Sequence, residues 1–76
     1  MLRYKGYMIS GSSIPIYAKG CQSCGSVCKA GRAGSLIELQ RIDGEMFKTR
    51  KEAEAHGLAL AREWVDRKTA WRVPVS

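Results

Sequence analysis

The stretch TRKEAEAHGLALAREWVDRK, residues 49–68, decides the fold of this chain of 76 residues. Thr49 and Glu52 have the spacing of a capping box, in which each side chain satisfies a free backbone N–H at the start of a helix. No proline follows within the stretch, and small or apolar residues recur at spacings of three and four, which predicts one apolar stripe on a helix over residues 50–68. The stripe consists of Ala53, Gly57, Leu60, Ala61 and Trp64. We expect it to cover a sheet, with Gly57 allowing a close approach and Leu60 and Trp64 giving most of the buried area.

The chain begins with a segment of strand-forming residues. Aromatic and aliphatic side chains over residues 2–9 predict a first strand that closes in the Ser-Gly-Ser-Ser run after it, and we favour Tyr7 and Ile9 as its core-facing residues. Residues 14–17 are expected to form an extended connection, because Pro15 lacks the N–H that a central strand needs.

Two further strands are expected before the helix. Residues 22–29 alternate small and apolar side chains, and residues 30–34 are rich in turn formers, which predicts a strand followed by a flexible hairpin loop. The third strand, residues 35–42, has the alternation of a half-buried antiparallel strand, with Ile37 and Leu39 facing the core.

A turn then leads toward the helix. Asp43-Gly44 predicts a tight turn, and residues 45–48 form either a short fourth strand or the approach to the helix. The fold class is therefore α+β, a three-stranded or four-stranded antiparallel sheet against one long C-terminal helix (βββα). It occupies residues 1–69 as a single domain, with residues 70–76 as an extended or frayed tail.

Composition places the chain among ordinary globular proteins. It is 45% apolar and 26% charged, unlike a disordered chain. No apolar run is long enough to span a bilayer and the first residues do not resemble a signal peptide, so we expect a cytoplasmic protein without a membrane partner.

The net charge of +6 is unevenly distributed. All seven acidic residues lie from Glu38 onward, and the part before it carries five basic residues and no acid. This asymmetry favours an anionic partner, so one hypothesis is nucleic-acid binding by the basic N-terminal strands; the alternative is a solubilising surface. The five residues are Arg3, Lys5, Lys19, Lys29 and Arg32.

Three cysteines lie within eight residues. Cys21 and Cys24 have the spacing of a zinc knuckle, and Cys28 and His56 would complete a four-ligand set. Structural zinc sites usually contain two such pairs, however, and an extended chain would hold Cys24 and Cys28 about 13 Å apart. We therefore predict reduced thiols and no cofactor, with zinc as the alternative.

Catalytic motifs are missing from the sequence. No ordered nucleophile, base and acid set stands out, and the glycine-rich Gly31-Arg32-Ala33-Gly34 lacks the lysine and threonine of a phosphate loop. We predict that the protein is not an enzyme.

Much of the chain resembles a family of short bacterial domains of unknown function, built from a small antiparallel sheet and a C-terminal helix. The resemblance implies the fold and no catalytic residues. The strand and helix plan is also similar to that of AP2-like and integrase-arm DNA-binding domains, which is analogy alone. The matching segments are Tyr4-Lys5-Gly6-Tyr7, Leu39-Gln40-Arg41-Ile42-Asp43-Gly44, Phe47-Lys48-Thr49, residues 53–58 and Trp64-Val65-Asp66.

These observations favour a binding or interaction module with a protein partner, or self-association, over nucleic-acid binding. Leu58 and Val65 fall outside the helix stripe and form a second apolar edge. Together with Trp71 they are the candidate dimer interface. The alternative is that the C-terminal tail folds back over that edge.

Overall fold

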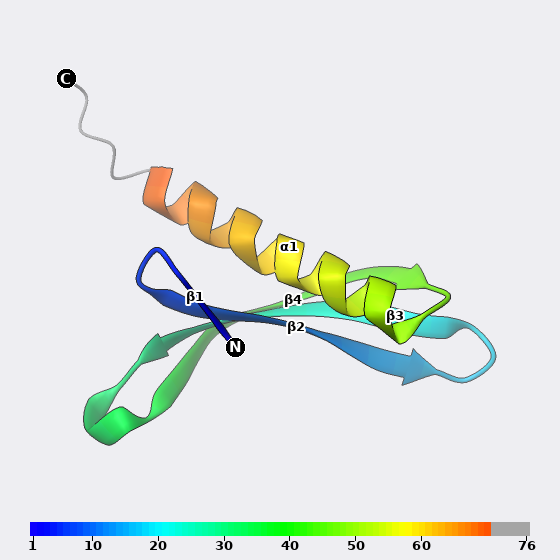
Figure 1. Ribbon diagram of the computed structural model, residues 1–76, viewed down its shortest axis with the longest axis horizontal. Coiled ribbons are helices and arrows are strands. Elements are labelled where there is room, and N and C mark those ends of the chain that lie inside the picture. The colour runs from blue at the N-terminus through cyan, green and yellow to red at the C-terminus, as the bar shows by residue number, and fades with distance from the viewer. Residues whose placement is uncertain (71–76) are drawn as a thin grey trace.

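The structure, a computed structural model, describes residues 1–70, which form a four-stranded antiparallel sheet and one helix (Figure 1). The strands lie side by side in chain order, each paired with the next. This arrangement confirms the predicted α+β class. The elements are β1 (Leu2–Tyr4), β2 (Tyr7–Ile16), β3 (Gly20–Ala30), the 3-10 turn η1 (Arg32–Gly34), β4 (Leu36–Phe47) and α1 (Arg50–Ala70).

The expected first strand is divided by a tight turn. Lys5 and Gly6 both have positive φ, 50° and 86°, as the two central residues of a type I′ hairpin turn require. The strand after this turn, β2, does not end in the Ser-Gly-Ser-Ser run but continues to Ile16, which corrects the prediction. Pro15 is tolerated inside it because β1 pairs only as far as Ile9, so the rest of β2 lies at the edge of the sheet.

The predicted turn at Asp43-Gly44 is also wrong, because β4 passes through it without a break. Two irregularities in the pairing of β4 with β3 explain why Asp43-Gly44, which is typical of a turn, lies inside a strand. At one, Gly44 and Glu45 oppose the single residue Ser23; at the other, Leu39 has no residue opposite. Both are β-bulges, which add an extra residue to a strand and increase its bend and twist.

The helix lies on one face of the sheet, over β2 and β3, at very short distance. Gly11 of β2 and Gly25 of β3 are directly paired, and Gly57 of α1 packs above them. A Cβ atom at any of these three positions would lie closer than 3.0 Å to backbone atoms across the interface. The close approach expected at Gly57 is confirmed.

The buried stripe of α1 differs from the predicted one. Ala53, Gly57, Ala61 and Val65 are buried at a strict spacing of four, whereas Leu60 and Trp64 are only half-buried at the flank. Val65, expected outside the stripe, is fully buried. The helix rises away from the sheet toward its C-terminal end (Figure 1), so a branched side chain fits at position 65 where only small ones fit before it.

The core is centred on β2, β3 and the second half of α1. Tyr7 and Ile9 face the helix as predicted, with the Tyr7 ring against Trp64 in an edge-on contact. Ile37 and Leu39, predicted to face the core, are instead 54% and 41% exposed. The hairpin between β3 and β4 extends past the helix (Figure 1), so no described element covers them as a second layer.

The start of the helix agrees in part with the predicted capping box. The Glu52 N–H donates to Thr49 Oγ1 at 3.2 Å, but the Glu52 carboxylate accepts from the Thr49 hydroxyl at 2.9 Å and not from its backbone N–H. Ala70, placed in the tail by the prediction, is the last residue of α1. The remainder of the expected tail, residues 71–76, lies outside the described residues.

We expect Gly57→Ala to lower the free energy of unfolding. In an exposed helix this change would add about 1 kcal/mol of stability, but here the new methyl group would collide with the Cys24 carbonyl group and cost about 1–3 kcal/mol. Urea unfolding of the two proteins measures the difference. Ala59→Gly, on the exposed side of α1, is the control and should cost about 1 kcal/mol. A Gly57→Ala protein as stable as wild type would contradict the close contact.

Candidate interaction surface

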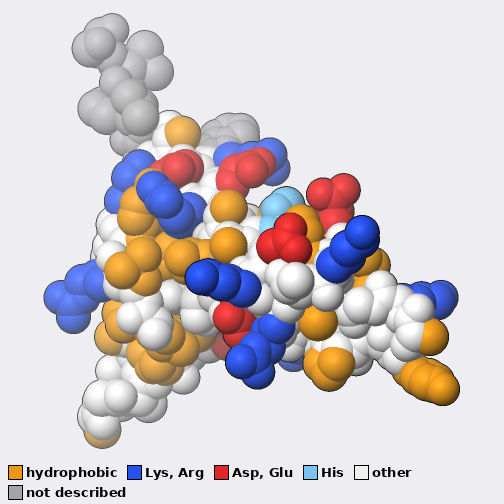
Figure 2. Space-filling view, turned by 45° about the vertical axis from the view of Figure 1, so that its right-hand side comes forward, with side chains coloured by type: hydrophobic (Ala, Val, Ile, Leu, Met, Phe, Trp, Pro, Cys, Tyr) orange, Lys and Arg blue, Asp and Glu red, His pale blue; other side chains and the backbone are white. Residues whose placement is uncertain are grey.

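The five basic residues of the N-terminal half do not form one surface. Lys19 lies in the β2–β3 turn, at the opposite end of β3 from Lys29 and Arg32. Arg3 pairs with Met8 across β1 and β2 and so lies on the face away from the helix. Figure 2 shows Lys and Arg side chains scattered over this view of the molecule, with hydrophobic side chains grouped between them.

Lys5 is engaged within the chain. Its Nζ donates to Asp66 Oδ1 at 2.8 Å, and the Tyr4 hydroxyl donates to the same oxygen at 2.7 Å. The guanidinium of Arg62 stacks over the Tyr4 ring at 5.2 Å. The hydrogen bonds from Lys5 and then Tyr4 lower the pKa of Asp66, and the hydrogen bond to Asp66 raises the pKa of Lys5. This cluster ties the β1–β2 hairpin to the last turns of α1, so Lys5 has an intramolecular anionic partner.

We expect the Asp66 cluster to stabilise the fold only while its carboxyl is ionised. Because the folded pKa is lowered, the contribution is present above the ordinary carboxyl range, about pH 4, and is lost as the pH falls through the lowered value. The raised pKa of Lys5 extends the contribution into the alkaline range, until Lys5 itself deprotonates. Asp66→Asn should therefore lower the urea midpoint at pH 7, with a difference from wild type that shrinks in acid.

The control for this experiment is Glu54→Gln, which removes a carboxylate of α1 whose ion pair with Arg50 is solvent-exposed and 3.9 Å long. This variant should keep the difference in urea midpoint between neutral and acid pH near the difference that wild type shows. An Asp66→Asn protein with the wild-type pH profile would show that the cluster contributes no stability.

The candidate metal ligands are divided between the two faces of the sheet. Strict alternation along β3 places Cys21 with Ser23 and Gly25 on the helix side, and Cys24 and Cys28 on the other side. His56 lies on α1 and packs against the Phe47 ring at 5.0 Å between centroids. Residues 1–70 contain no group of three or more His, Cys, Asp or Glu side chains placed to hold a metal ion. The four ligands of the alternative zinc site are not brought together.

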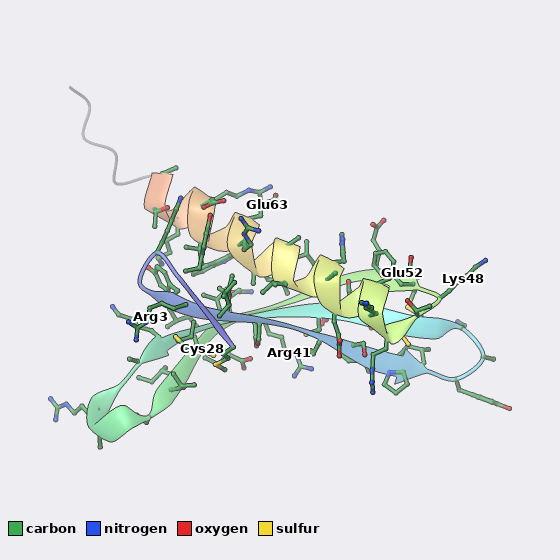
Figure 3. The ribbon with its side chains drawn as sticks, viewed as in Figure 1. Arg3, Cys28, Arg41, Lys48, Glu52 and Glu63 are labelled. Carbon is green, nitrogen blue, oxygen red and sulfur yellow. The ribbon has the colours of Figure 1, made fainter. Side chains whose placement is uncertain are left out.

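All three thiols are free, and their environments differ. Cys28 is 6% exposed and Cys24 1%, and the Cys24 Sγ accepts a hydrogen bond from Arg41 Nε at 3.2 Å. Arg41 extends on the side of the sheet away from α1 (Figure 3), where it covers this thiol. Cys21 is half-buried.

These environments predict a graded thiol reactivity. With an aromatic disulfide reagent under native conditions, we expect Cys21 to react first and Cys24 and Cys28 to react only as the sheet opens. Cys21→Ser should remove the fast phase and leave the slow one unchanged.

Metal analysis of the same protein, purified without chelator, should find less than one equivalent of zinc; a full equivalent with loss of folding on chelation would contradict this prediction.

The predicted helix-edge interface does not present the residues assigned to it. Val65 is fully buried under α1, and Leu58 is half-buried against the core. Trp71 lies outside the described residues. Val65 is therefore corrected from an interface residue to a core residue, because the helix stripe advances by four residues per step.

The outer edge of β4, the side of the strand that faces away from β3, is an open edge of the sheet. The described chain places no strand against it over the 12 residues of β4, and it carries a concentration of exposed apolar side chains. The alternation of residues 35–42 indicates an apolar face, but Ile37 and Leu39 of that face are exposed and not in the core. The exposed side chains are Leu36 at 48%, Ile37 at 54%, Leu39 at 41% and Met46 at 42%.

Beside this edge, the helix side of β4 is hollowed. Gln40 and Ile42 of β4 and Leu60 and Trp64 of α1 are among the residues that line the hollow. Leu60 and Trp64 are half-buried because α1 contacts β4 less than it contacts β2 and β3. The apolar flank of the helix thus borders the open strand.

Comparisons with known proteins found no matching family model, no matching curated protein and no matching solved structure. The resemblance to short bacterial domains stays a prediction. Among the described residues, no helix has the length and apolar character needed to cross a membrane.

Proposed function

We propose that this protein is a small non-catalytic binding module that pairs a strand of a protein partner with the outer edge of β4. The observation that carries the proposal is the outer edge of the 12-residue strand β4, against which the described chain places no strand, together with the four exposed large apolar side chains of β4. An open edge strand offers a row of backbone donors and acceptors, and natural proteins use such edges to bind extended segments.

The other edge of the sheet is less suitable. β1 covers β2 from Tyr7 to Ile9, and Pro15 removes a donor from the part that remains. That part is also short in large apolar side chains, being mostly serine and glycine. Affinity and side-chain selectivity are therefore concentrated on β4.

We infer that the module works in the cytoplasm and without a cofactor. The three free thiols support a reducing compartment. The scattered basic residues and the pairing of Lys5 with Asp66 favour a protein partner over a nucleic acid.

Position-specific photo-cross-linking in cells tests the proposal. A photoreactive residue at Leu39, on β4, should give discrete protein cross-links. The same residue at Ala59, on the exposed side of α1, is the matched control and should give few.

Two results together would overturn the proposal in favour of nucleic-acid binding. They are equal labelling from Leu39 and Ala59, and an affinity for short DNA that falls steeply with salt and is weakened by Lys29→Gln with Arg32→Gln. Equal labelling without DNA binding would overturn it as well.

A further inference from the structure

The pattern of β4 is symmetric about Ile42. The two extra residues of its bulges, Leu39 and Glu45, stand three positions before and three positions after Ile42. Gly44 and Glu45 both lie on the helix side, because a Cβ at Gly44 would meet Ser23 Oγ, Leu60 and His56 and the Glu45 carboxylate lies 4.0 Å from His56 Nε2. The two halves of the strand therefore present their side chains to the two faces in mirror order.

We propose that the strand that pairs with β4 is β4 of a second copy of this chain, antiparallel and centred on Ile42. This inference rests on the proposed function and names its partner. Opposite residues in such a pair have numbers that add up to 84, so Arg41 faces Asp43 of the second copy and Ile42 faces its own equivalent.

In this register, each residue of β4 lies on the same face of the sheet as the residue opposite it in the second copy. Residues directly opposite each other in an antiparallel pair must point to the same face. Arg41 and Asp43 both lie on the face away from α1, since they pair with Ser26 and Cys24. Ile37 and Phe47, which would be opposite, both lie on the helix side, and the bulged residues Leu39 and Glu45 oppose each other.

The charges select this register over its neighbours. Around the axis it places two Arg41–Asp43 pairs next to each other, and no like charges are opposite. A shift by two residues in one direction would place Arg41 opposite Arg41; a shift in the other direction would place Asp43 opposite Asp43. Like charges directly opposite are destabilising, and both shifts also misalign the bulges.

Within β4, one other arrangement pairs unlike charges without placing like charges opposite each other. An axis between Leu39 and Gln40 would place Glu38 opposite Arg41 of the second copy. It spans only the first part of β4, leaves Met46 unpaired and puts a bulge on the axis. The Ile42-centred register is the one that uses the full strand.

Apolar contacts accompany the charge pairs. The twofold axis is perpendicular to the sheet, so both helices lie on the same face of an eight-stranded sheet. The hollows, lined by Ile42, Leu60 and Trp64 and also by Gln40, Glu63 and Arg67 in each copy, then lie on the two sides of the axis. Exposed Ile37 gains Phe47 of the second copy as a neighbour.

Sedimentation equilibrium over a wide concentration range tests this pairing. Wild type should be a monomer–dimer mixture or a dimer, and Asp43→Arg should raise the dimer dissociation constant roughly tenfold or more, because two pairs are lost and two repulsions appear. Arg41→Asp should have the same effect. The double variant with both changes should return to within about threefold of wild type, since two opposite pairs of this kind are restored.

The controls separate charge, fold and register. Glu54→Arg changes the net charge as Asp43→Arg does, but on exposed α1, and should leave association unchanged; far-UV circular dichroism and urea unfolding establish that each variant is folded. If Glu38→Arg weakens the dimer and Asp43→Arg does not, the Ile42-centred register is wrong. A monomeric wild type overturns self-pairing. If Leu39 then cross-links to another protein, the proposed function stands. If it does not, self-pairing and the proposed function both fail.

Discussion

The arrangement of the molecule depends on the contact between the backbone of α1 and the backbones of β2 and β3. Gly57 meets the backbone of β3 at Cys24 and Gly25, and Gly11 of β2 meets the helix backbone at Glu54 and Leu58, without any side chain in between. The other buried residues of the helix before Val65 are alanines. A contact of this kind buries little apolar area per residue and gains its stability from close packing over several turns. The helix held at this distance lies over β2 and β3 and contacts β4 less, so β4 is the least covered of these three strands.

Local sequence signals predicted the elements that depend on local chemistry. The helix, the Thr49 cap, the inward Tyr7 and Ile9, and the close approach at Gly57 all follow from spacing or residue type, and the structure confirms them. The assignment of core residues was less successful, because alternation shows only that two faces of a strand differ. It does not show whether a second layer lies above them, and residues 1–70 provide none above Ile37 and Leu39.

The errors in strand length have a similar cause. Asp43-Gly44 and the Ser-Gly-Ser-Ser run of β2 contain residues that end strands in isolation. Here the sheet uses Gly11 for contact with the helix and Gly44 at a bulge, so tertiary packing overrides the local preference. Val65 was misplaced because a stripe that repeats every four residues drifts around the helix. Lys5 looked like a free cation because its partner, Asp66, is 61 residues away.

The features that protect β4 are also the ones that make its pairing selective. Bulges and charged side chains are common defences of edge strands, because they prevent a flat strand from adding indiscriminately. A strand without matching bulges would lose face agreement with β4 within a few residues, and a strand of the wrong charge order would oppose like charges. A second copy of β4 satisfies both conditions through symmetry alone, since Arg41 and Asp43 flank Ile42 and the bulged residues are equidistant from it. The restriction that disfavours most partners therefore favours this one.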